Sequence, residues 1–176
     1  MSADYVLENS TNETLKTLVG EMLAYCEAAE AYFAGETVAT IDANVEQSAT
    51  TTITGNDENI AIAGATLVLE AQTSIRIYFN LKNDMAIDNV VCKIGGETVT
   101  PVLKNEETQL YYVEVSVAAK DLNTNYEISV GDYTLTYCAM TYVATVVNTN
   151  GVNMNLQNLV KALYNYSVAA DGYFGA

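Results

Sequence analysis

Apolar residues recur with a helical period at both ends of the chain, and the two recurrences are nearly the same. Leu, Leu, Val, Tyr, Ala, Ala, Tyr and Phe occur within residues 15–33 and again, 141 positions later, within residues 156–174. Together with the near-equivalent pair Met22 and Leu163, the matches begin i, i+3, i+4, i+7, which places them on one stripe of an α-helix. The pattern predicts helices over residues 11–34 and 153–174. We expect both stripes to be buried, namely Leu15, Leu18, Val19, Met22, Tyr25, Ala29 and Phe33 in the first helix and Leu156, Leu159, Val160, Leu163, Tyr166, Ala170 and Phe174 in the second.

Between these helices the apolar positions follow the period of two that β-strands require. Residues 74–81 alternate cleanly, with Ile75, Ile77 and Phe79 on one side. Short runs of this kind, separated by Gly, Asn and Asp, are typical of a sandwich or barrel of about seven to nine strands. The pairs Gly95-Gly96 and Gly131-Asp132 predict two tight hairpins, and strands are expected over 38–41, 50–54, 66–71, 74–81, 89–94, 97–103, 109–117, 126–130 and 133–138.

These patterns together predict an α+β protein, a mostly antiparallel immunoglobulin-like sandwich over residues 37–138 with one long helix at each end of the chain. A single domain is expected over residues 1–176. Residues 1–10 are interpreted as a leader, and residues 139–147 as either a short helix or a further strand. Tyr126 follows a Leu by four residues and opens an alternating strand. This arrangement fits either a tyrosine corner or an ordinary hairpin with a Tyr at its start.

Charge and residue types limit the function. The chain has 22 acidic residues against seven basic ones and a formal charge of −15, so its surface repels phosphate backbones and anionic lipid. No apolar run reaches the roughly 18 residues of a membrane span, so we expect neither nucleic-acid binding nor membrane insertion. The absence of His removes Ser–His and Cys–His catalysis, and no phosphate-binding loop is present. We therefore expect no enzyme activity and no cofactor.

The three cysteines do not predict a metal site, because they are widely spaced and have no His partners. Cys92 and Cys138 lie in strand-like runs, where we expect buried free thiols; a disulfide between them is the alternative. Cys26 takes the place of Ser167 in the repeat, which favours packing as a small buried residue.

Strand parity brings a candidate ligand-binding face into view. Arg76, Tyr78 and Asn80 point to one outward face, and Tyr112 and Glu114 point outward on a strand expected in the same sheet. Aromatic faces flanked by hydrogen-bonding groups are what carbohydrate recognition requires. The alternative is a face covered by one terminal helix, with Arg76 capping the carbonyl groups at the end of that helix.

Three stretches, residues 64–79, 118–126 and 159–174, read together resemble modules near the ends of large secreted or surface-attached proteins of gut and rumen clostridia, including ruminococcal ones. The resemblance implies an extracellular location and a module of a longer precursor, and it carries no established activity. We expect a non-catalytic accessory module that binds a polysaccharide or a surface protein. The alternative is a structural spacer or assembly module whose paired helices pack modules together.

Overall fold

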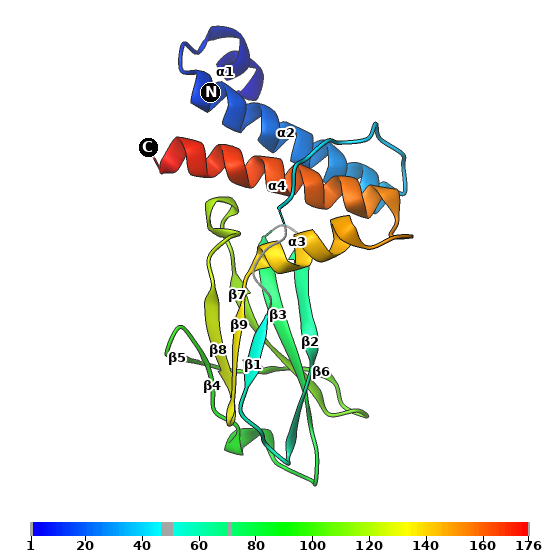
Figure 1. Cartoon of the computed structure of the whole chain (residues 1–176), viewed down its shortest axis with the longest axis vertical. Coiled ribbons are helices and arrows are strands. Elements are labelled where there is room, and N and C mark those ends of the chain that lie inside the picture. Colours follow the sequence, from blue (N-terminus) through cyan, green and yellow to red (C-terminus); the bar gives the residue numbers. More distant parts are fainter. Residues whose placement is uncertain (1, 47–50, 70–71, 176) are drawn as a thin grey trace. The chain divides into compact units, whose positions relative to one another are not determined.

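The computed structural model describes residues 2–46, 51–69 and 72–175, and over these ranges the chain is an α+β protein with helices at both ends and two antiparallel sheets (Figure 1). It divides into two compact units. The helical unit comprises the described residues of Met1–Ser48, Ala118–Leu122 and Tyr142–Ala176, and the sheet unit comprises those of Ala49–Val117 and Asn123–Thr141. The single domain expected over residues 1–176 stays a prediction.

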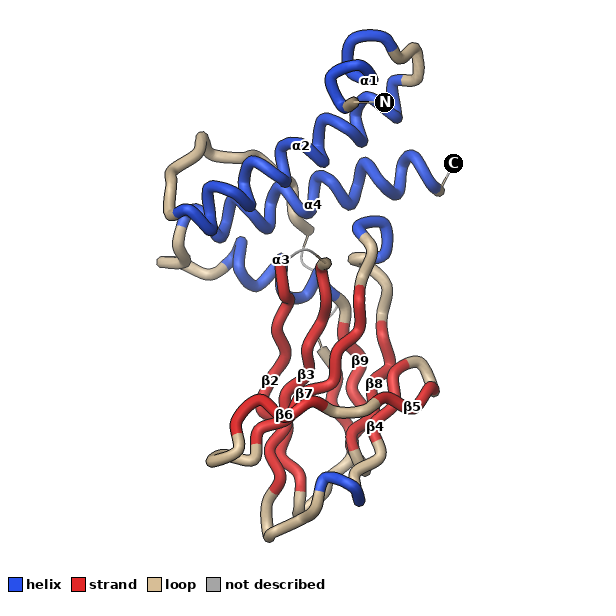
Figure 2. Tube along the Cα trace, turned by 180° about the vertical axis from the view of Figure 1, so that it is seen from behind, coloured by secondary structure: helices blue, strands red, loops and turns tan. Residues whose placement is uncertain are grey.

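Two long helices dominate the helical unit. Helix α2 spans Glu13–Ala34 and helix α4 spans Met154–Phe174, in good agreement with the predicted ranges. The Asn12 side chain accepts from the Leu15 N–H at 3.0 Å, and Gly35 ends α2 in the left-handed conformation, with φ 72°. The helices lie side by side and run in opposite directions (Figures 1 and 2). Tyr25 and Tyr166, which are equivalent in the repeat, stack with their ring centroids 6.1 Å apart.

The predicted helical stripes are buried along most of their length but not at their ends. Buried members are Leu18 in α2 and Leu159, Val160, Leu163 and Ala170 in α4. Half-buried members are Leu15, Val19, Met22, Tyr25, Ala29, Leu156 and Tyr166. The prediction is wrong for Phe33 and Phe174, which are 64% and 63% exposed. Each ring lies in the last turn of its helix and packs edge-on against the preceding tyrosine, Tyr32 or Tyr173.

Two further helices complete the helical elements. Helix α1, Ala3–Asn9, replaces the expected leader, and the Ser2 hydroxyl caps it by accepting from the Tyr5 N–H. Helix α3, Ala139–Asn148, decides the open choice at residues 139–147 in favour of a helix. The division between the two units falls inside α3. Over the part of the chain that the structure describes, no helix is both long and apolar enough to cross a membrane.

The connection from Glu36 to Glu46 has no regular structure, so the strand expected around residues 38–41 is wrong. Side-chain amides of α4 hold this connection instead. Asn155 donates to the Glu36 carbonyl at 2.6 Å, and the buried Asn158 accepts from Ile41 N–H at 3.1 Å and donates to the Ala39 carbonyl at 3.3 Å. The segment that was expected to form a strand therefore lies along α4 and not in a sheet.

The sheet unit contains two antiparallel sheets that together resemble a sandwich (Figure 1). The first has the order β1 (Thr52–Thr54), β9 (Tyr133–Tyr137), β8 (Tyr126–Val130), β4 (Cys92–Ile94) and β5 (Glu97–Val99). The second has the order β2 (Ile60–Leu69), β3 (Thr73–Leu81), β7 (Leu110–Ser116) and β6 (Val102–Asn105). Short 3₁₀ turns occur at η1 (Ile87–Asn89) and, in the helical unit, η2 (Ala119–Asp121). Both predicted hairpins are confirmed by the pairs Ile94–Glu97 and Val130–Tyr133.

Two strand predictions need correction. The run at residues 97–103 is not one return strand, because the chain leaves the first sheet after β5 and enters the second at β6, with Pro101 between them. The strand expected at 66–71 begins earlier, at Ile60, because the chain forms a bulge between Ile62 and Gly64 rather than a turn, and Gly64 has φ 140°. Residues 70–71 of that prediction and residue 50 of the 50–54 strand lie outside the described residues. The inward-facing Ile75, Ile77 and Phe79 are fully buried as predicted.

The three cysteines, all within the described residues, form no disulfide. Cys92 and Cys138 are buried, as predicted. Cys92 pairs with Val130, and Val130 pairs with Tyr133. Cys138 lies five residues beyond Tyr133 in the chain, which at about 3.3 Å per residue displaces it from Cys92 by about 16 Å along the strands. The two thiols are therefore too far apart for a disulfide. The prediction for Cys26 is wrong, because it lies exposed on α2 whereas its counterpart Ser167 is buried.

Candidate functional site

The antiparallel register of β3 and β7 brings the predicted face residues together. Arg76 pairs with Glu114, and Tyr78 pairs with Tyr112. Asn80 lies on the same side, opposite Leu110. Paired residues of neighbouring strands share one face of a sheet, so these side chains form one surface, named here the Arg76 face.

An ion pair organises the Arg76 face. Arg76 Nε lies 3.2 Å from Glu114 Oε1, in a contact that lacks hydrogen-bond alignment. The Ser74 hydroxyl donates a short hydrogen bond to the same carboxylate oxygen. The Arg76 guanidinium carbon lies 4.7 Å from the centroid of the Tyr112 ring, within the range of a cation–π contact. The Ser74 hydroxyl and the Tyr112 ring therefore hold the charged pair in place.

The ion pair shifts the pKa of both partners. Burial alone would raise the pKa of Glu114, but the Ser74 hydroxyl and the Arg76 guanidinium outweigh it and hold that pKa below its ordinary value of 4.5. Burial alone would lower the pKa of Arg76, but Glu114 and Tyr78 outweigh it and raise that pKa. The side chain of Glu114 is 33% exposed and that of Arg76 is 21% exposed. A larger fraction of the Glu114 side chain than of the Arg76 side chain is therefore exposed to solvent.

A row of side chains crosses the four strands beside the ion pair. Gly64 on β2 lies opposite Tyr78, which pairs with Tyr112 on β7, which in turn pairs with Val102 on β6. The two phenol rings are half-buried, with centroids 5.6 Å apart and planes tilted by 47°. Gly64 carries no side chain, and a Cβ built on it meets nothing within 4 Å. The row is therefore a twisted aromatic surface with an open end at Gly64.

Asn80 lies on the same face, but its side chain is used in a hydrogen bond to the backbone. Its amide nitrogen donates to the Thr108 carbonyl at 2.9 Å, which ties β3 to the loop before β7. Ser74, Gly64 and Val102 also belong to the Arg76 face, although they were not predicted as site residues. Gly64 and Val102 are identified only by the register that pairs them with Tyr78 and Tyr112.

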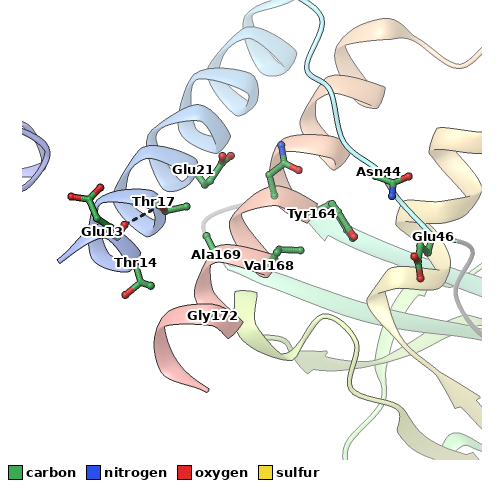
Figure 3. A pocket seen from close by; sticks show the side chains of 11 residues that line it. Glu13, Thr14, Thr17, Glu21, Asn44, Glu46, Tyr164, Val168, Ala169 and Gly172 are labelled. Carbon is green, nitrogen blue, oxygen red and sulfur yellow. Dashed lines mark hydrogen bonds between the residues drawn. The ribbon is translucent and has the colours of Figure 1, made fainter. Parts of the chain in front are cut away.

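A second candidate site lies in the helical unit and was not predicted. A groove of about 570 Å³ runs between the first half of α2 and the second half of α4, with the 36–46 connection as its third wall (Figure 3). We call it the α2/α4 groove. Its lining is Glu13, Thr14, Thr17, Glu21, Asn44, Glu46, Tyr164, Asn165, Val168, Ala169 and Gly172.

The α2/α4 groove is rich in hydrogen-bond acceptors and has no basic residue in its lining. Its acidic members Glu13, Glu21 and Glu46 come from two separate segments, and Val168 lies 55% exposed among them. The Asn165 amide donates to the Asp42 carbonyl at 3.1 Å, which leaves its carbonyl oxygen as an acceptor. The spacing i, i+1, i+4, i+8 on α2 is a sequence signal for this wall, but it cannot show which helix lies opposite.

Among the described residues there is no group of three or more His, Cys, Asp or Glu that could hold a metal ion. Comparison with known proteins finds no matching family model, no similar curated protein and no similar solved structure.

Proposed function

We propose that this chain is a non-catalytic binding module of a secreted or cell-surface bacterial protein, and that its Arg76 face contacts a polysaccharide. The sheets would then form an immunoglobulin-like sandwich that presents this face. The observation that carries the proposal is the cross-strand arrangement of Tyr78 and Tyr112 beside the Arg76–Glu114 pair. It supplies aromatic surface and a fixed carboxylate on rigid strands, and a sugar ring needs an apolar contact together with hydrogen-bond partners for its hydroxyl groups.

The charges favour a neutral polysaccharide. The net charge of −15 repels acidic polymers, and Glu114 is the partner of the ion pair whose side chain is more exposed. A carboxylate accepts hydrogen bonds from sugar hydroxyls but repels uronate and sialate groups. Neutral β-glucans and arabinoxylan should therefore bind more tightly than polygalacturonate or mucin.

Affinity electrophoresis on these four polymers, followed by calorimetry on the best one, tests the proposal. Tyr112→Ala and Tyr78→Ala should each weaken binding about tenfold, which corresponds to about 1.4 kcal/mol. Tyr5→Ala removes a tyrosine that is 54% exposed on α1 and serves as the control. Retardation of the wild type by none of the polymers, or an equal loss in Tyr5→Ala, contradicts the proposal.

A second candidate function, an assembly module, is favoured by one observation. Phe33 and Phe174 occupy equivalent positions of the repeat, and both rings are largely exposed. Two such rings are suited to packing against neighbouring modules. Sedimentation equilibrium should then show a dimer or larger assembly that Phe33→Ser with Phe174→Ser dissociates, whereas Val91→Ser, at a residue 56% exposed in the sheet unit, leaves it intact.

A further inference from the structure

The sequence repeat makes one wall of the α2/α4 groove equivalent to a surface of α4 that binds residues 36–41 of the same chain. Shifting Thr14 and Thr17 of α2 by the repeat distance of 141 gives Asn155 and Asn158 of α4. Those two asparagines hold the 36–41 stretch by hydrogen bonds to its backbone. Thr14 and Thr17, in contrast, line the open α2/α4 groove (Figure 3). The groove is thus the counterpart, within the helix pair, of a surface that binds an extended segment.

The hydrogen-bonding state of the two threonines fits the same task. The Thr14 hydroxyl donates to Asn12 Oδ1 at 2.8 Å, and the Thr17 hydroxyl donates to the Glu13 carbonyl at 3.0 Å. Their hydrogens are used, so both oxygens are left to accept from peptide N–H groups. From Glu13 to Glu21 the wall is about 12 Å long, at 1.5 Å per helical residue, which about four residues of extended peptide would cover.

We propose that the α2/α4 groove binds an extended, basic segment of a partner protein. Charge complementarity selects the partner. Glu13, Glu21 and Glu46 line the groove and no basic side chain does. Glu13 is paired with Lys16 at 3.4 Å, so Glu21 and Glu46 are the acids that would repel an acidic peptide and attract lysine or arginine side chains. Val168 and Ala169 give the small apolar floor against which the peptide backbone packs. This proposal does not depend on the polysaccharide site, which lies in the other unit.

The probe is a synthetic peptide whose sequence follows the stretch that the chain itself binds. Residues 36–43 read Glu-Thr-Val-Ala-Thr-Ile-Asp-Ala. The test peptide is acetyl-Lys-Thr-Val-Ala-Thr-Ile-Lys-Ala-amide, in which lysine replaces both acids, and the acidic parent peptide is the control. Calorimetry at low salt, with the whole chain, should show binding of the basic peptide and none of the parent.

Three variants locate the binding. Val168→Trp fills the groove from an exposed position and should weaken binding at least tenfold, and Glu21→Gln should weaken it about fivefold. Glu30→Gln makes the same charge change on the same helix at an exposed residue outside the groove and should leave the dissociation constant unchanged. Far-ultraviolet circular dichroism checks that each variant is folded. The proposal is overturned if the basic peptide does not bind, if Val168→Trp leaves its affinity unchanged, or if Glu30→Gln weakens it as much as Glu21→Gln.

Discussion

Single residues on the Arg76 face act through their neighbours across the strands. Glu114 on its own would be one of 22 solvated acids, but the register places Arg76 opposite it and Ser74 close enough to donate to it. Strand parity predicted the side on which each residue lies. It could not predict exposure, as Ser74 demonstrates: it lies on the outward side, yet it is only 3% exposed. Parity is local, whereas exposure depends on every element nearby.

The lowered pKa of Glu114 predicts a pH-dependent contribution to stability. Because its folded-state pKa lies below the ordinary value of 4.5, the contribution is fully present above that pH and is lost as the pH falls through the folded-state value. Urea unfolding should show Glu114→Gln less stable than the wild type at pH 7 and nearly equal to it in strong acid. The difference should be modest, since water screens the partly exposed pair. Glu97→Gln, at an exposed residue of β5, is the control, and a Glu114→Gln deficit that persists unchanged in acid would contradict the assignment.

At the scale of elements, the two terminal helices have the same sequence stripe but different burial. The α4 stripe is buried at Leu159, Val160, Leu163 and Ala170. Helix α2 buries Leu18 together with Ala28 and Ala31, which were not assigned to the stripe. A periodic pattern identifies a helix and its apolar side. It cannot tell how far the partner extends, so Phe33 and Phe174 in the last turns were wrongly expected to be buried.

Leu163 and Phe174 together test this reading of α4. Leu163→Ala removes a fully buried side chain and should lower the free energy of unfolding by about 2–5 kcal/mol. Phe174→Ala removes a larger but exposed ring and should change it by no more than about 0.5 kcal/mol. Urea denaturation followed by circular dichroism at 222 nm measures both. A larger effect of Phe174→Ala than of Leu163→Ala would mean that the ring is packed.

Among the strands, the hairpins were predictable from the sequence but the change from one sheet to the other was not. Gly95-Gly96 and Gly131-Asp132 predicted their hairpins because a two-residue turn determines which strands pair. The change of sheet between β5 and β6 has no comparable local signal, since both strands are short and Pro101 is compatible with either an edge or a connection. The α2/α4 groove was missed for the same reason: its walls come from segments far apart in the sequence.

For the whole molecule, the division into two units does not follow the order of the chain. The helical unit is built from three separate segments and the sheet unit from two, and α3 has residues in both. Neither unit can therefore be cut out as one continuous piece. We therefore expect the two units to unfold together, because loss of one unit would release the ends of the segments that form the other.

Cooperative unfolding is the measurable consequence at this scale. Circular dichroism at 222 nm reports mainly on the helices, and labelling of the buried thiols reports on the sheet unit. Burial raises the pKa of Cys92 to about 11, so this thiol stays protonated and unreactive until the sheet unit unfolds. In a Cys26→Ser background, which removes the exposed thiol, the two probes should give the same urea midpoint. Leu163→Ala, a change in the helical unit, should move both midpoints equally. If thiol labelling keeps the wild-type midpoint while the helical signal moves to lower urea, the two units unfold independently and the chain is two domains.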